Sequence, residues 1–103
     1  MAVDKFIEFL LFEKNYSQHT AVAYQRDLEM FQAFLSREFS GSKVSEVNYS
    51  QIRTWIVALV GSHISNRTIN RKVSSLNSYY KYLLKVQSID SNPLTKHRAL
   101  KVS

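Results

Sequence analysis

Cationic and hydroxyl side chains line one side of the segment 66–86, at alternating steps of four and three residues. This row contains no acid and no bulky apolar side chain. Arg can clamp a phosphate or pair with guanine through two hydrogen bonds, while small hydroxyls donate to phosphate oxygens and let a helix approach closely. On a helix, such a row suits the major groove of DNA. Its members are Arg67, Arg71, Ser74, Ser78, Lys81 and Lys85.

The ordinary alternative for this row is a solvated helix face. A solvated face usually mixes both charges, because pairs four residues apart stabilise a helix. Here no Asp or Glu occurs from Arg53 to Ile89. The start of the segment, from Ser65 to Thr68, would also direct backbone N–H groups at an anion. Both observations favour DNA over a merely solvated face.

Enzyme chemistry finds no comparable support in this sequence. The three histidines, His19, His63 and His97, lie far apart and lack the spacing of metal ligands. Two glycines cannot build a Gly-rich phosphate loop, no Gly-x-Ser-x-Gly elbow occurs, and cysteine is absent. We therefore expect no catalytic site, no metal and no cofactor in these residues.

The elements that would position the cationic row are helices. Apolar residues recur with the 3.6-residue period in four segments, which predicts helices over 3–14, 18–37, 49–60 and 66–86. Each of the second and fourth segments follows a helix and a short turn. The sequence therefore predicts an all-α fold, in which two helical hairpins pack together as a four-helix bundle.

Local signals mark the ends of these helices. Ser17 and Ser65 are suited to cap the second and fourth helices, because a hydroxyl accepts from a backbone N–H two or three residues on. Asn48 followed by Gln51 resembles a capping box for the third helix. Gly61 fits the position just after that helix.

The apolar side chains predict which surfaces are buried. Tyr24 and Tyr80 fall at core spacing, and Val44 and Val47 are expected to reach the core from the connection between the second and third helices. The fourth helix carries one apolar stripe, opposite the cationic row, formed by Ile69, Val73, Leu76, Tyr80 and Leu83.

The first helix carries more apolar surface than one stripe needs. Phe9 and Phe12 are the surplus residues. Exposed apolar surface on a small domain often marks a contact site, so we expect at least one of the two rings to be exposed. The alternative is that the bundle buries both.

Composition and charge narrow the class of protein. The chain has 103 residues, 45% of them hydrophobic, which corresponds to one domain, and its two glycines and single proline argue against an all-β fold. The absence of cysteine, of an 18-residue apolar run and of a leader-like start fits a cytoplasmic protein. Residues 51–103 hold nine Lys and Arg against the single acid Asp90, which indicates a polyanionic partner.

Several short motifs occur in a characteristic order. They are Phe6-x-x-Phe9-Leu10, Ser17-x-x-Thr20-x-x-x-Tyr24-x-x-Asp27-Leu28-x-x-Phe31, Ile52-Arg53-x-Trp55-Ile56-x-x-Leu59, Ser65-x-x-Thr68-Ile69-Asn70-Arg71-Lys72-Val73-Ser74-Ser75-Leu76 and Asn92-Pro93-Leu94. Together they resemble the N-terminal core-binding domain of tyrosine recombinases, the phage-integrase and Xer-like group. The resemblance covers residues 3–94.

The resemblance implies a SAM-like four-helix bundle, which forms a clamp around DNA together with a separate catalytic domain. It implies that the helices over 18–37 and 66–86 face the major groove. The residues then expected to face DNA are Ser17, His19, Thr20, Arg26, Arg67, Thr68, Asn70, Arg71, Ser74 and Ser75, with Lys81 added from the cationic row.

The resemblance also implies a division of the chain. Residues 1–92 correspond to the core-binding domain, and residues 93–103 to the start of an interdomain linker, with 94–103 a basic tail of little specified structure. The Arg, Lys, His and Tyr groups of the catalytic domain have no counterpart here, so we expect no strand transfer by these residues.

The expected partners are duplex DNA and other recombinase protomers assembled on it, with the isolated domain monomeric. Two other functions stay open at this point. One is a free-standing helical DNA-binding regulator, and the other is a protein-interaction bundle whose basic face meets an acidic partner.

Overall fold

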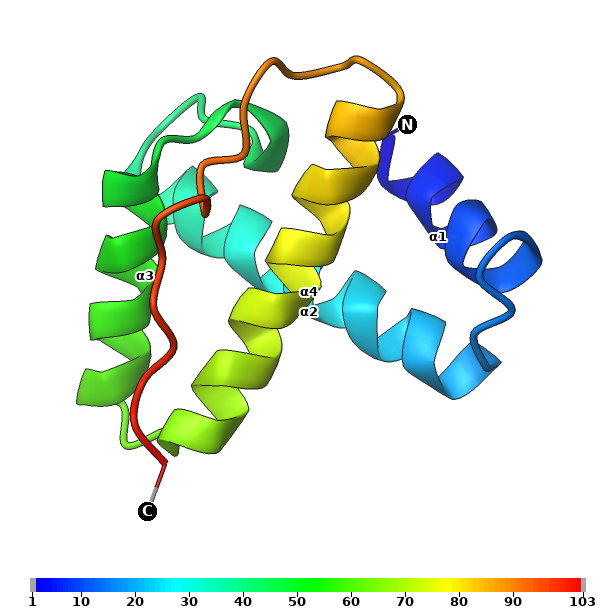
Figure 1. Cartoon of the computed structure of the whole chain (residues 1–103). Coiled ribbons are helices and arrows are strands. Elements are labelled where there is room, and N and C mark those ends of the chain that lie inside the picture. The colour runs from blue at the N-terminus through cyan, green and yellow to red at the C-terminus, as the bar shows by residue number, and fades with distance from the viewer. Residues whose placement is uncertain (1, 103) are drawn as a thin grey trace.

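The computed structural model describes residues 2–102 and forms four α-helices in the expected order (Figure 1). This part of the chain contains no strand, so the predicted all-α fold is confirmed. None of its helices is long and apolar enough to span a membrane. The helices are α1 (Ala2–Phe12), α2 (Gln18–Glu38), α3 (Tyr49–Gly61) and α4 (Asn66–Lys85), with a single 3-10 turn, η1 (Val44–Glu46), before α3.

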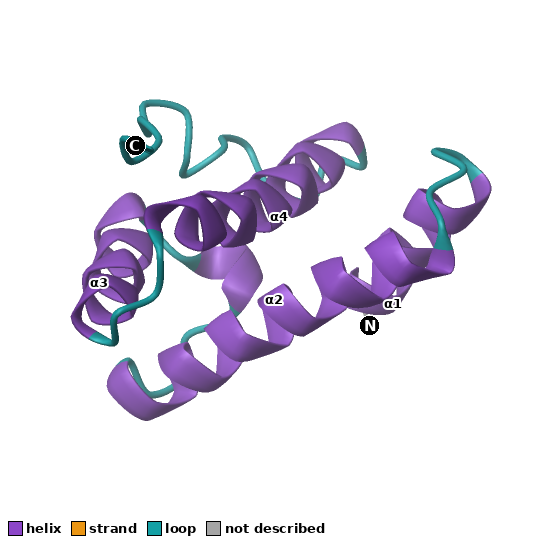
Figure 2. Ribbon diagram, turned by 90° about the horizontal axis from the view of Figure 1, so that it is seen from below, coloured by secondary structure: helices purple, strands orange, loops and turns teal. Residues whose placement is uncertain are grey.

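Helices α2 and α4 cross at the centre of the molecule in Figure 1, and Figure 2 shows α4 above α2. Helix α1 packs on the first half of α2 and on the C-terminal part of α4, where the rings of Phe6 and Tyr79 lie 5.3 Å apart. Helix α3 lies against the other half of α2, with 4.8 Å between the rings of Phe31 and Trp55. The crossing brings the two helices expected to face DNA into direct contact.

The predicted stripe of α4 forms the centre of the core. All five of its members are buried, and so is Val44, whose carbonyl accepts a 2.8 Å hydrogen bond from the Tyr80 hydroxyl. Burial raises the pKa of Tyr80, so this hydroxyl keeps its proton. Tyr24 and Val47 are only half-buried, and both pack against the edge of the core.

The predicted N-caps are all confirmed. The hydroxyls of Ser17 and Ser65 each accept from the backbone N–H three residues on, at 3.2 Å, and Asn48 with Gln51 forms a complete capping box. The expectation for Gly61 is wrong, because Gly61 is still helical. The left-handed residue after α3 is His63, with φ of 64°.

The segment after α4 is more specifically placed than its sequence indicated. It returns along α3 and α4 and is drawn in orange and red in Figure 1. Leu94 is buried in the core, and the Tyr49 hydroxyl lies 2.9 Å from Nδ1 of His97. The expectation of a basic tail with little specified structure is therefore wrong for residues 94–102, because apolar burial and hydrogen bonds hold this segment.

Candidate nucleic-acid interface

The N-terminal half of α4 carries an exposed row of polar residues. Arg67 and Ser74 are exposed, and Arg71 has half of its side chain accessible. Among residues 2–102, Arg67 has no acid within ion-pair distance. The apolar stripe on the opposite side packs α4 on the core, so the first half of the predicted row faces outward. There it offers cationic and hydroxyl groups to an incoming anion.

The C-terminal half of the same row has different surroundings. Ser78, Lys81 and Lys85 border the junction with α1. The Lys85 ammonium lies 4.8 Å from the centre of the Phe9 ring, a cation–π contact. The row is therefore divided: its second half borders α1, whereas its first half lies away from α1.

The starts of α2 and α4 have the same local structure. In each, the capping serine also bonds the hydroxyl of the threonine three residues on, at 3.0 Å: Ser17 with Thr20, and Ser65 with Thr68. These hydroxyls thus stabilise the helix ends, and each retains further capacity for hydrogen bonds. His19 and Arg26, the other α2 residues expected to face DNA, are exposed.

A buried ion cluster joins the two helices at their crossing. The carboxylate of Asp27 on α2 accepts from Nη1 and Nη2 of Arg71 on α4, at 2.7 and 3.3 Å. It also accepts from the Lys72 ammonium at 3.3 Å and from the Ser75 hydroxyl at 2.7 Å. Four donors therefore surround one carboxylate whose side chain is only 2% exposed. A buried charge needs such partners, because each unsatisfied oxygen would be costly.

Sequence reasoning gave no role to Asp27, although a signal was present. Asp27 stands on the buried side of α2, in register with Tyr24, Leu28 and Phe31. An acid on an apolar stripe must either be exposed or find cations, and the basic stretch of α4 was the available source.

The cluster changes the interpretation of two predicted residues, Ser75 and Arg71, and it buries a third side chain, that of Lys72. Ser75 is fully buried, and its hydroxyl is donated to Asp27, so it cannot face DNA in this structure. Half of the Arg71 side chain is accessible, but Asp27 of α2 holds its guanidinium. Lys72, a neighbour of Arg71 in sequence, is buried rather than exposed.

Asn70 also differs from expectation. Its amide forms two 2.9 Å hydrogen bonds with the backbone of Leu100, and the Asn66 amide donates to the carbonyl of Lys101 at 2.9 Å. The face of α4 that carries these two residues is therefore covered by the C-terminal segment. Asn70 thus has one amide donor and its carbonyl oxygen engaged within the chain.

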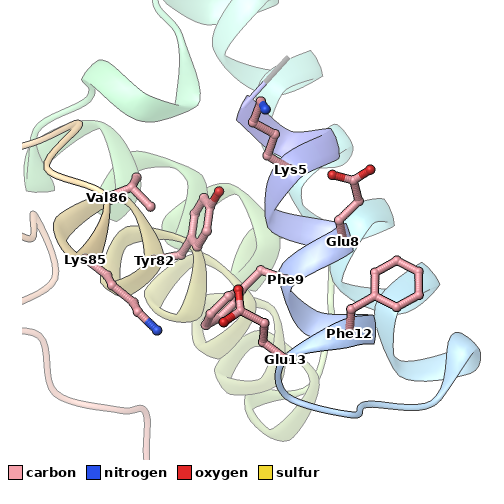
Figure 3. Close-up of a pocket in the computed structure, with 8 residues that line it drawn as sticks. All are labelled: Lys5, Glu8, Phe9, Phe12, Glu13, Tyr82, Lys85 and Val86. Carbon is pink, nitrogen blue, oxygen red and sulfur yellow. The ribbon is translucent and has the colours of Figure 1, made fainter.

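A groove of about 490 Å³ runs between α1 and the end of α4 (Figure 3). The side chain of Phe9 points into it and packs on Tyr82, with ring centres 5.1 Å apart. Phe12 stands at its edge and is 76% exposed. The expectation that at least one of the two surplus rings is exposed is therefore confirmed. Within residues 2–102, no three acidic or imidazole side chains gather as metal ligands.

Comparison with known proteins gives consistent matches. Residues 3–87 match the family described as phage integrase, N-terminal SAM-like domain. The chain is 41% identical over 88 residues to tyrosine recombinase XerC of Anoxybacillus flavithermus, covering 85% of the chain and 29% of that relative. It is 35% identical over 101 residues to XerC of Oceanobacillus iheyensis (98% and 33%) and 35% identical over 94 residues to tyrosine recombinase XerD of Rickettsia bellii (89% and 30%). It thus spans about a third of the curated relatives' length, and no solved structure matches it.

Proposed function

The chain belongs to the family of phage-integrase N-terminal SAM-like domains, and from that premise we propose that it is a DNA-binding module of a site-specific tyrosine recombinase. In this role it forms one half of a clamp around duplex DNA in the bacterial cytoplasm. The observation that carries the proposal is the first half of α4, where Arg67, Arg71 and Ser74 are accessible and no exposed acid interrupts them. The matched residues are the N-terminal domain alone, so chemistry on DNA belongs to the part of the relatives that this sequence does not cover.

The proposed contacts come from both crossing helices. Long cations contact phosphates or guanine, and hydroxyls at the helix starts contact phosphates beside the backbone N–H groups. Ser75 is left out because it is buried, and Asn70 because it binds Leu100. Lys81 is kept at the margin of the surface. The remaining set is Ser17, His19, Thr20, Arg26, Arg67, Thr68, Arg71 and Ser74.

The proposal is tested by fluorescence anisotropy with a labelled DNA duplex at a series of salt concentrations. Neutralising about four to six phosphates gives a plot of log affinity against log salt with a slope of about −4 to −5. We expect weak binding with little sequence preference, because one half of a clamp makes mainly phosphate contacts. Affinity that does not change with salt, or no binding at about 50 mM salt, contradicts the proposal.

A pair of variants tests the location of the surface. Arg67→Ala should weaken DNA binding by about 1–3 kcal/mol if this side chain makes a bidentate contact, with no effect on folding. Lys14→Ala removes the same charge from an exposed position at the end of α1, and should have little effect. Equal losses in both variants would show that the surface has been placed wrongly.

The same family premise supports a second set of partners, namely other recombinase protomers assembled on DNA. The exposed ring of Phe12 is an apolar group available for such a contact.

The alternative function, a free-standing DNA-binding regulator, is distinguished from a recombinase by the gene itself. A reading frame that continues past Ser103 into a domain with a tyrosine nucleophile supports the recombinase.

A further inference from the structure

We propose that Asp27 is a positioning residue of the DNA-contacting surface, which holds the Arg71 guanidinium by one edge and leaves the other edge for a phosphate or a base. This inference rests on the proposed function. It assigns to a buried acid on α2 the task of orienting a cation on α4.

The geometry of the pair supports this division of the guanidinium. Arg71 has five N–H donors, and two of them, one on each Nη, are directed at the Asp27 oxygens at 2.7 and 3.3 Å. The Nε–H and one outward N–H on each Nη remain. Because half of the Arg71 side chain is accessible while Asp27 is 2% exposed, the remaining donors are the ones that an approaching ligand can reach.

The surroundings of Asp27 keep this arrangement fixed. Lys72 and Ser75 occupy the acceptor positions of the carboxylate that Arg71 does not use. Asp27 therefore has no free rotation to a solvent-exposed position, and the guanidinium it holds is ordered before a ligand arrives. A side chain ordered in advance does not lose its freedom on binding, which favours affinity.

The charges of the cluster also leave Arg71 attractive to an anion. One carboxylate is surrounded by two cations, so the cluster as a whole carries a positive charge. The Asp27 carboxylate is buried, whereas half of the Arg71 side chain is accessible. A phosphate would meet the cation first.

Two other roles for Asp27 make different predictions. If the acid acts only in folding, its removal lowers stability without changing how Arg71 contributes to DNA binding. If the negative charge of Asp27 mainly offsets the positive charge of Arg71, its removal tightens DNA binding. Positioning predicts instead that removal weakens binding and that the weakening occurs through Arg71.

The experiment is a double-mutant cycle of Asp27→Asn and Arg71→Ala, read by DNA affinity under conditions in which circular dichroism shows every variant folded. In the native background, Arg71→Ala should weaken binding about tenfold. With Asn at position 27, the same change should cost at most about twofold, because the guanidinium is no longer held. Asp90→Asn, the same loss of charge at an exposed site beyond the end of α4, serves as the control.

Equal effects of Arg71→Ala in the two backgrounds overturn the proposal, and so does tighter binding by Asp27→Asn beyond that of Asp90→Asn. Asp27→Asn leaves Lys72 buried without its carboxylate, which lowers stability, and a variant that is not folded cannot be used in the cycle. A second variant, which keeps the acid, decides the matter in that case.

That variant is Arg71→Lys, with Arg67→Lys as its matched control. A lysine at position 71 keeps the charge and can satisfy Asp27, but a single ammonium cannot offer a second planar edge to the DNA. Arg71→Lys should therefore lose about as much affinity as Arg71→Ala. A loss much smaller than that of Arg71→Ala contradicts the proposal, while Arg67→Lys reports what the same exchange costs at a cation that no acid holds.

These outcomes separate the inference from the proposed function. If Arg67→Ala and the salt dependence behave as expected while Arg71 variants bind normally, the DNA-binding surface stands and the role of Asp27 is wrong. If no variant on α4 changes DNA binding, the proposed function itself fails.

Discussion

The amide of Asn70 both donates to and accepts from the backbone of Leu100, with two hydrogen bonds of 2.9 Å between residues 30 positions apart. One turn earlier on α4, Asn66 donates to the next backbone carbonyl, that of Lys101. The side chains of Asn66 and Asn70 thus hydrogen-bond the backbone of the C-terminal segment, as the backbone of a neighbouring β-strand would. They determine the path along which the chain leaves the bundle, beside the start of α4 (Figure 1).

Replacing Asn70 with Ala should release this segment without unfolding the bundle. The loss of two hydrogen bonds predicts a destabilisation of about 1–2 kcal/mol, measured by chemical denaturation. The Leu100 amide should exchange with solvent much faster, as measured by NMR hydrogen exchange. Ser74→Ala, an exposed change one turn further along α4, should leave both quantities unchanged, and slow exchange of Leu100 in the Asn70 variant contradicts the proposed hold.

The elements of this fold follow from local signals in the sequence. The stripe from Ile69 to Leu83 predicts both the extent and the buried side of α4, because a 3.6-residue period leaves only one face for the core. Ser17 and Ser65 predict the helix starts because a capping hydroxyl acts within three residues. Signals that act over three or four residues do not depend on how the helices later pack together.

The site was less accessible to sequence reasoning, because its contacts join distant positions. The spacing of α4 places Arg71 on its polar side and the resemblance adds Ser75, but only the crossing with α2 brings Asp27 beneath them. Asn70 likewise meets Leu100 only after the chain turns back. The glycine signal predicts the left-handed residue at Gly61, whereas α3 extends one residue beyond the predicted end and the left-handed residue is His63.

Tyr80 should show the separate contributions of a ring and a hydroxyl. Tyr80→Ala removes a fully buried ring and should destabilise the domain by about 3–5 kcal/mol. Tyr80→Phe keeps the ring but leaves the Val44 carbonyl without its donor, so the loss should be about 1–3 kcal/mol. Urea denaturation measures both. A Tyr80→Phe variant as stable as the native chain would mean that this hydrogen bond contributes nothing.

Phe12 should tolerate a polar replacement that Phe6 does not. Phe12 is 76% exposed, so Phe12→Ser should change the free energy of unfolding by no more than about 0.5 kcal/mol. Phe6 is fully buried against Tyr79 and Tyr82, so Phe6→Ser should cost several kcal/mol. Phe9, half-buried in the groove, should lie between them. A large loss for Phe12→Ser would exclude this ring as a free contact surface for a second protomer.

His97 should make the docking of the C-terminal segment sensitive to acid. Partial burial lowers the pKa of His97 below its ordinary value of 6.5, so the released segment binds a proton more readily than the docked one. Docking is therefore fully stable above about pH 6.5 and weakens as the pH falls toward the lowered pKa. In the tautomer whose Nδ1 accepts from the Tyr49 hydroxyl, 2.9 Å away, protonation of that nitrogen also removes the acceptor.

The measurement for His97 is an NMR titration of its ring, followed together with the exchange of the Leu100 amide between about pH 5 and 7.5. Exchange, corrected for its intrinsic pH dependence, should show increasing release of the segment as the His97 ring becomes protonated. His97→Gln keeps a hydrogen-bonding side chain but cannot titrate, so its docking should be independent of pH over this range. The same acid-induced release in His97→Gln, or a His97 ring that titrates above 6.5, would rule out this imidazole as the sensitive group.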